Sequence, residues 1–153
     1  MQARLDAMKA APGAYRAMAQ LQGYVDGTSL EKGLLELVKM RASQINGCAY
    51  CIDMHSKDAL ALGESAQRLF ALDAWRETPF FTERERAALA WTEAVTLVSQ
   101  GHVPDAVFEE ARAHFTDEEL VNLTMAVVAI NAWNRVAIAF RSEAGTYKAA
   151  AHG

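Results

Sequence analysis

The chain of 153 residues contains only two cysteines and no run of lysine or arginine. Two thiols are too few for the disulfide framework of a small secreted domain. The net charge is −4, so the sequence offers no basic surface for nucleic acid or an anionic membrane, and we expect neither partner. Nine glycines and three prolines are also few, which argues against a disordered chain.

Long hydrophobic runs are missing as well. Residues 1–13 carry charges within the first six positions and have no continuous apolar stretch, so they indicate neither a secretory signal nor a membrane anchor. Residues 119–141 are the most apolar segment, but four polar residues interrupt it: Asn122, Asn131, Asn134 and Arg135. We therefore expect a buried helix here, no membrane association and a cytoplasmic location.

Hydrophobic residues make up 52% of the chain, and a domain of this length buries about 70% of the surface that its unfolded chain exposes. The apolar positions recur with helical spacing, and no segment alternates with a period of two. The sequence thus predicts an all-α, single-domain bundle of about seven helices within residues 1–145, and a frayed tail at 146–153. Because the last helix is apolar nearly all round, we expect the chain to form an oligomer.

Local signals place the helices along the chain. Three capping boxes predict helix starts: Thr28 with Glu31, Thr82 with Glu85, and Thr116 with Glu119. Pro104 suits a first helical position, and three glycines mark helix ends: Gly27, Gly63 and Gly101. The predicted helices span residues 4–23, 29–45, 48–62, 65–73, 82–99, 104–114 and 117–142.

Both cysteines lie in one short stretch, INGCAYCIDMH, at residues 45–55. On a helix that begins near residue 46 or 47, Cys48, Cys51 and His55 fall on one stripe. The i,i+3 spacing lets the two thiols bond, and the i,i+4 spacing lets His55 reach the sulfur of Cys51. The helix N-terminus, the second thiol and the imidazole would each favour a thiolate.

A thiolate beside a second thiol can reduce an electrophilic oxygen or sulfur. One cysteine becomes a sulfenic acid or a mixed disulfide, the other closes an internal disulfide, and an outside reductant must reopen it. Position at the helix start favours Cys48 as the attacking thiol, whereas the histidine favours Cys51. We prefer Cys51, with Cys48 as the resolving cysteine, because an adjacent proton acceptor can also protonate the leaving alkoxide.

Two other interpretations of the pair stay open. C-x-x-C with one histidine is half of a zinc site, but none of the other histidines stands at ligand spacing, so we expect no metal. Those histidines are His102, His114 and His152. Alternatively, the cysteines are buried structural residues beside an incidental histidine. The rival from another class is therefore a non-catalytic helical oligomer that senses redox state or binds metal.

The stretch ELVKMRASQINGCAYCIDMHSKDALALG, residues 36–63, resembles the AhpD-like alkylhydroperoxidases of the carboxymuconolactone decarboxylase superfamily. Their signature is a glutamate, eleven residues, C-x-x-C and a histidine four positions later, here Glu36, Cys48, Cys51 and His55. The segments AWRETPFFTERERAALAWTEAV and NAWNR are similar too, so the resemblance covers most of the chain. It implies an all-helical peroxidase, a trimer or hexamer, that reduces hydroperoxides without a cofactor. Its implied recycling partner is a lipoyl-bearing or thioredoxin-like dithiol protein.

The resemblance alone singles out Glu36. Its helical position beside Lys32, Lys39 and Ser43 indicates an ordinary solvated residue. The family pattern instead implies a carboxylate that polarises His55 directly or through water, as a third group orients the base of a nucleophile–base pair. Both interpretations hold if this face of the helix turns toward a neighbouring helix or subunit.

One residue departs from the family pattern. Tyr50 stands where the best-known members carry a histidine, and a phenol with a pKa near 10 cannot shuttle protons at neutral pH. We expect it to pack or to donate a hydrogen bond to a bound peroxide. In NAWNR (131–135) the amides and the guanidinium are expected to serve structure or subunit contacts.

These observations together predict a thiol-dependent peroxidase, in which Cys51 and Cys48 alternate between dithiol and disulfide. His55 relays the proton and Glu36 orients it. Lactone decarboxylation, the activity that names the superfamily, is disfavoured because those decarboxylases lack the paired cysteines.

Overall fold

The computed structural model describes residues 2–150, and all regular structure within this range is helical. The elements are α1 (Ala7–Ala10), α2 (Pro12–Asp26), α3 (Lys32–Asn46), α4 (Ala49–Ala61), α5 (Ala66–Ala71), the 3-10 helix η1 (Leu72–Glu77), α6 (Glu83–Thr96), α7 (Asp105–His114) and α8 (Asp117–Phe140). The predicted all-α bundle is confirmed, with eight α-helices and one 3-10 helix in the described residues.

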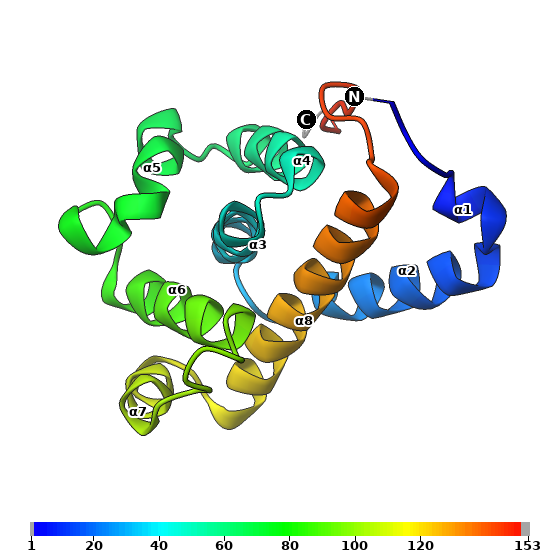
Figure 1. The fold of residues 1–153 in the computed structure, drawn as a ribbon. Helices are drawn as coiled ribbons and strands as arrows, with labels where there is room; N and C mark the ends of the chain where they lie inside the picture. Colours follow the sequence, from blue (N-terminus) through cyan, green and yellow to red (C-terminus); the bar gives the residue numbers. More distant parts are fainter. Residues whose placement is uncertain (1, 151–153) are drawn as a thin grey trace.

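Helix α3 lies at the centre of the bundle. It packs against α4 on one side, α6 on another and the long α8 on a third (Figure 1). Helix α7 packs on α6, α2 packs on α8, and α1 packs on α2 at the edge of the bundle. Since α3 and α4 are consecutive and antiparallel neighbours, any side chains that face each other across them come from a short stretch of sequence.

The predicted helix at residues 4–23 is wrong, because α1 ends at Ala10 and a new helix starts at Pro12. Proline has no backbone N–H and suits the first position of a helix, where that group has no partner in any case. Helix α2 then continues to Asp26, three residues beyond the predicted end.

Two of the three capping boxes are confirmed, at Thr82 with Glu85 and at Thr116 with Glu119. The third, at Thr28 with Glu31, is wrong. The Thr28 hydroxyl donates to the carbonyl of Val25, and Glu31 is itself the N-cap of α3, with its carboxylate bound to Arg84. Pro104 is the N-cap of α7 and not its first residue, so that boundary moves by one position.

Within residues 2–150, α8 is the one helix with the length and hydropathy to cross a membrane. It packs against α2, α3, α4, α6 and α7, and nine of its residues are buried, which is the arrangement of a core helix. Three of its large apolar side chains remain exposed: Val121, Val128 and Ile138. The expected oligomer stays a prediction.

Candidate functional site

The cysteine pair lies at the junction of α3 and α4. Helix α3 ends at Asn46, and Gly47 follows in the left-handed conformation with φ of 67°. Glycine adopts this conformation without the steric cost that a Cβ atom would bring. Cys48 is then the N-cap of α4, so this helix begins one residue after the predicted range 48–62 and two to three residues after the start assumed for the stripe.

The three residues of the predicted stripe, Cys48, Cys51 and His55, are all buried, and Ala59 one turn further along α4 is buried as well. Both cysteines are free thiols with 1% of their surface exposed. They form a small core cluster with apolar residues of α3 and α8: Ala42, Ile130 and Ala137. Tyr50 packs against this cluster, as one of its two predicted roles required.

The two thiols differ in acidity. The Cys51 thiol donates a hydrogen bond to the Cys48 sulfur, which stabilises the Cys48 thiolate. The backbone N–H groups of Cys51 and Tyr50 stabilise it further, and these hydrogen bonds outweigh the cost of burying the charge. Together with the side chain of Asn134 they lower the pKa of Cys48 to about 7. The same shared proton and burial raise the pKa of Cys51. This favours Cys48 as the thiolate, against our preference for Cys51.

His55 does not serve Cys51 in the way that we expected. No hydrogen bond joins its ring to either sulfur in the described part of the chain, and Nδ1 lies 2.9 Å from Oε2 of Glu36. Because a carboxylate only accepts, Nδ1 carries the proton and Nε2 is left as the free acceptor. Proton exchange with the sulfurs therefore needs a substrate atom or a small movement of the ring.

Glu36 is buried, with 7% of its surface exposed, so the solvated position indicated by periodicity is wrong. Its face of α3 turns toward α4, and its second oxygen accepts from Nζ of Lys39 at 2.8 Å. Burial by itself would raise the pKa of the Glu36 carboxyl, but the hydrogen bond from His55 and the Lys39 charge bring it below its ordinary value. The contact with His55 that the resemblance implied is present.

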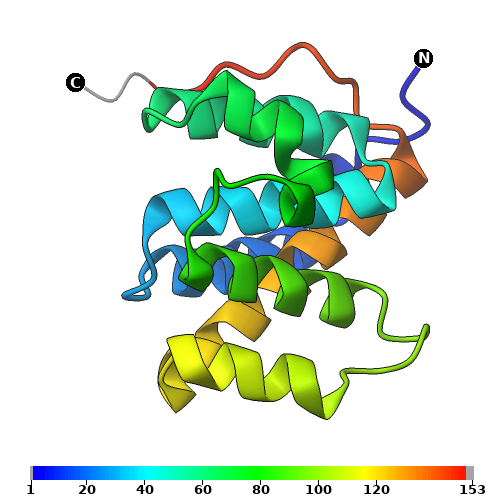
Figure 2. The same cartoon turned by 90° about the vertical axis from the view of Figure 1, so that its left-hand side faces the viewer.

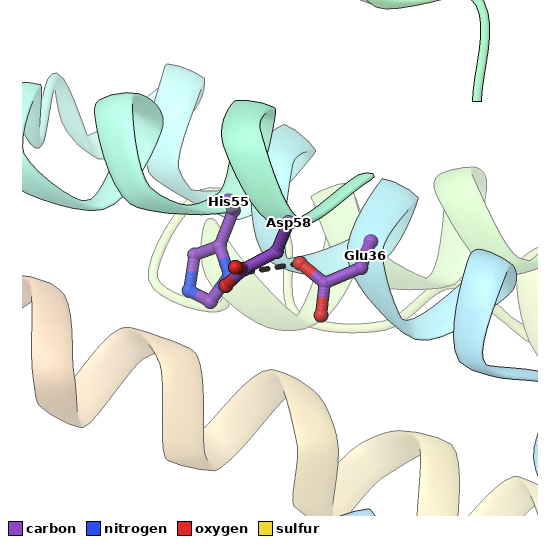
Figure 3. A group of neighbouring side chains, drawn as sticks. All are labelled: Glu36, His55 and Asp58. Atoms are coloured by element: carbon purple, nitrogen blue, oxygen red, sulfur yellow. Dashed lines mark hydrogen bonds and ion pairs between the residues drawn. The ribbon is translucent and has the colours of Figure 1, made fainter. Parts of the chain in front are cut away.

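Asp58, one turn beyond His55 on α4, joins this group, and sequence reasoning missed it (Figure 3). One ligand atom from each of Glu36, His55 and Asp58 lies within 4.8 Å of the others, the arrangement of a possible cation site. The Lys39 ammonium already donates to one carboxylate oxygen of Glu36, and the Tyr147 hydroxyl donates to Asp58 at 2.7 Å. These partners suit a hydrogen-bonded acid–base group better than a metal site. His152, one of the other histidines, lies outside the described residues.

Asn134 is the further residue that the structure brings to the sulfurs. It is fully buried in α8, and its amide acts on both cysteines to lower their pKa values. Its Nδ2 also donates to Oγ of Ser43 at 3.0 Å, and its Oδ1 accepts from Asn46 at 2.9 Å. The segment NAWNR thus contributes structure, as predicted, and also a donor beside the thiols.

We expect Asn134→Ala to raise the thiol pKa of Cys48 and to destabilise the fold by about 2 kcal/mol, since it leaves buried partners unpaired. The rate of iodoacetamide alkylation, measured against pH, reports the pKa. Asn122 is the matched control, because it is buried on the same helix and accepts from Tyr24. Asn122→Ala should cost similar stability and leave the thiol pKa unchanged. An equal pKa in both variants would contradict the assigned role of Asn134.

The sequence profile of the carboxymuconolactone decarboxylase family matches residues 12–94, from the start of α2 into the last turn of α6. This chain belongs to the carboxymuconolactone decarboxylase family. The matched segment includes all four residues of the predicted site, and the resemblance drawn from the sequence is confirmed. The family is named after an enzyme, and its profile by itself does not select one reaction.

One relative and one solved structure match this carboxymuconolactone decarboxylase family member over nearly its whole length. The uncharacterized protein YdfG of Bacillus subtilis (strain 168) is 38% identical over 146 residues, which are 95% of this chain and 99% of YdfG. A crystal structure of ATU0492 from Agrobacterium tumefaciens, a protein of unknown function provisionally named as antioxidant defence protein AhpD, superposes with a TM-score of 0.92. It is 46% identical, with 95% of this chain and 100% of that chain covered.

A more distant structure shows the fold alone. The debrominase Bmp8 superposes with a TM-score of 0.81 at 24% identity, over 91% of this chain and 75% of that chain. Proteins with different names therefore share this helical bundle, and the reaction of the present chain has to be argued from its own side chains.

Proposed function

We propose that this protein is a thiol-dependent peroxidase that reduces hydroperoxides through Cys48 and Cys51. The observation that carries the proposal is the pair itself: two free thiols lie together at the start of α4, and the Cys51 thiol donates to the Cys48 sulfur and lowers its pKa to about 7. One sulfur is thereby a thiolate near neutral pH, and the other is held beside it as a proton donor. That is the requirement for a dithiol that cycles through a disulfide.

In the first step the Cys48 thiolate attacks the terminal oxygen of the hydroperoxide. An S–O bond forms and the O–O bond breaks, so the sulfur is oxidised to a sulfenic acid and the alkoxide takes a proton and leaves as an alcohol. Cys51, as its thiolate, then attacks the Cys48 sulfur, and water leaves as the disulfide forms. The overall reaction converts one hydroperoxide and two thiols into an alcohol, water and a disulfide.

The His55–Glu36 pair is assigned the proton traffic of both steps. Glu36 holds the Nδ1 proton of His55, so Nε2 is available to accept the proton of Cys51 and later to donate one to a leaving oxygen. Lys39 balances the charge of Glu36, which keeps the carboxylate ionised although it is buried. Glu36 therefore acts through His55 as a positioning residue.

A dithiol partner must reduce the disulfide after each turnover. We propose a lipoyl-bearing or thioredoxin-like protein for this role, in a cytoplasmic trimer or hexamer of the chain. ATU0492, whose provisional name is that of an antioxidant protein, supports this general assignment.

The proposal is tested by mixing the reduced protein with less than one equivalent of cumene hydroperoxide and counting free thiols. We expect the wild-type protein to lose two thiols per peroxide. Cys51→Ala should lose one, because Cys48 is oxidised but has no second thiol with which to form a disulfide. His55→Ala should lose its thiols more slowly. The non-catalytic alternatives predict no peroxide consumption. Stoichiometric zinc in the purified protein, lost in His55→Ala, would favour the alternative that the protein is a metal-binding helical oligomer.

A further inference from the structure

The chain continues after α8 as a segment without helix, residues 142–150, called here the C-terminal strap. Helix α8 ends at Phe140. Its C-cap, Arg141, is in the left-handed conformation, and the N–H of Ser142 donates to the carbonyl of Ala137. The C-terminal strap then runs along the outside of α4 (Figure 2). It therefore passes over the helix that carries both cysteines and His55.

Three polar contacts fix the C-terminal strap to α4. The N–H of Gly145 donates to Asp53 at 2.9 Å, Nζ of Lys57 donates to the carbonyl of Tyr147 at 3.0 Å, and the Tyr147 hydroxyl donates to Asp58 at 2.7 Å. Gly145 has a φ of 92°, which only glycine adopts readily. The path of the C-terminal strap is thus set by specific bonds.

Tyr147 lies at the edge of the candidate site. Its pKa is raised to about 12 by burial, by the hydrogen bond to Asp58, and by the nearby groups Glu36 and Tyr50. Asp58 belongs to the cluster with Glu36 and His55, and Tyr50 packs against the core cluster that contains both cysteines. The Tyr147 phenol therefore lies beside the acid–base group of Glu36, His55 and Asp58.

The burial of the thiols conflicts with any reaction on them. Cys48 and Cys51 are each 1% exposed and His55 is 7% exposed, so a hydroperoxide cannot reach the sulfurs without a local opening. Helices α3, α4 and α8 cover the site through buried apolar contacts, which are costly to break. The C-terminal strap contributes no residue to the core and is held by polar contacts, so it belongs to the segments that open most easily.

We propose that the C-terminal strap is the access gate of the cysteine pair, and that the hydrogen bond from Tyr147 to Asp58 is its latch. Tyr147 then controls entry to the site and is not itself a catalytic residue. The physiological meaning of the gate rests on the proposed function, because it is the hydroperoxide that has to enter. The gate itself is a statement about thiol access and can be tested without peroxide.

The test is the rate at which iodoacetamide alkylates the reduced protein. When opening is fast and reversible, this rate follows the fraction of open molecules. Tyr147→Phe removes the latch and should accelerate alkylation about 5-fold, which corresponds to ~1 kcal/mol at 1.4 kcal/mol per tenfold change. Tyr147→Ala, which also removes the ring, should accelerate it further.

Tyr24→Phe is the matched control, since it removes the tyrosine hydroxyl that donates to Asn122 at 2.7 Å between α2 and α8. It should leave the alkylation rate unchanged. An open gate raises the rate by the same factor at pH 7 and pH 9. A shift in thiol pKa would instead give a factor that disappears at pH 9, and that outcome would overturn the gate.

Entry from another side of the bundle is the alternative outcome. An apolar cavity of about 260 Å³ lies between α1, α2 and the end of α8, with Ala14, Tyr15 and Trp133 in its wall. If Ala14→Trp slows alkylation while Tyr147→Phe has no effect, entry runs through this cavity and the proposal is wrong. A gate that responds as expected in a protein without peroxide turnover would contradict the proposed function alone.

Discussion

Cys48→Ser is expected to abolish hydroperoxide turnover and to remove the thiol that reacts with iodoacetamide at neutral pH. The pKa of Cys48 is lowered to about 7, so about half of this thiol is ionised at pH 7, against a few per cent for a free cysteine. In the reduced wild-type protein, alkylation should therefore rise with a midpoint near pH 7, and mass spectrometry should find the label on Cys48. In Cys48→Ser the remaining thiol should react only above its ordinary pKa.

The variants of Cys51 provide the control, because this thiol donates the proton that stabilises the Cys48 thiolate. Serine keeps an O–H donor at position 51 and alanine removes it. The midpoint of Cys48 alkylation should therefore lie at higher pH in Cys51→Ala than in Cys51→Ser. Labelling of Cys51 first, with a neutral-pH reaction that survives in Cys48→Ser, would restore Cys51 as the attacking thiol.

Glu36→Gln is expected to have the largest effect on stability. The substitution removes the nearer of the two carboxylates that pair with the Lys39 ammonium, in a site where the Glu36 and Lys39 side chains are about nine-tenths buried. Only the longer contact to Asp26, at 3.8 Å, remains. Removal of one partner from a buried pair should cost about 3 kcal/mol, and a chain of this size should lose roughly 6–12 °C in Tm. Peroxide turnover should also fall, because a neutral amide at position 36 lacks the charge that stabilises a protonated His55.

Glu110→Gln is the matched control, since Glu110 and His114 form a similar pair at 3.3 Å on the exposed face of α7. That substitution should change the free energy of unfolding by less than about 0.5 kcal/mol. The double variant Glu36→Gln with Lys39→Met should recover part of the lost stability. A small effect of Glu36→Gln, equal to that of Glu110→Gln, would show that the buried pair does not matter.

The pH dependence follows from the lowered pKa of Glu36. A carboxyl with a folded-state pKa below its unfolded value adds stability above the unfolded value, near 4.5, and this stability is lost as the pH falls through the folded value. The gap in stability between wild type and Glu36→Gln should therefore be full at neutral pH. It should shrink below about pH 4.5.

Sequence patterns predicted the features that depend on near neighbours. Helical spacing placed Cys48, Cys51 and His55 on one buried stripe, and two of the three capping boxes mark true helix starts. The box at Thr28 failed because the same side chains have other partners, a carbonyl of α2 and Arg84. The capping pattern identifies side chains that are able to cap a helix, but tertiary contacts determine whether those side chains bind the helix or another partner.

The rest of the site depends on contacts that no local pattern contains. The helical periodicity predicted that Glu36 is exposed to solvent. That prediction failed because α3 has a second buried face, which α4 covers. Asn134 and Tyr147 reach the site from the far end of the sequence, so only the folded chain brings them there. The order of attack was predicted from a histidine that turns out to bind Glu36.

The hairpin of α3 and α4 divides this molecule into two kinds of sequence. Glu36, the two cysteines and His55 all belong to twenty consecutive residues that turn at Gly47. The side chains that tune and enclose them, Asn134 and Tyr147, belong to α8 and the segment after it. Substitutions in α8 and in the segment after it can therefore change the surroundings of the reactive residues without changing the hairpin that carries them.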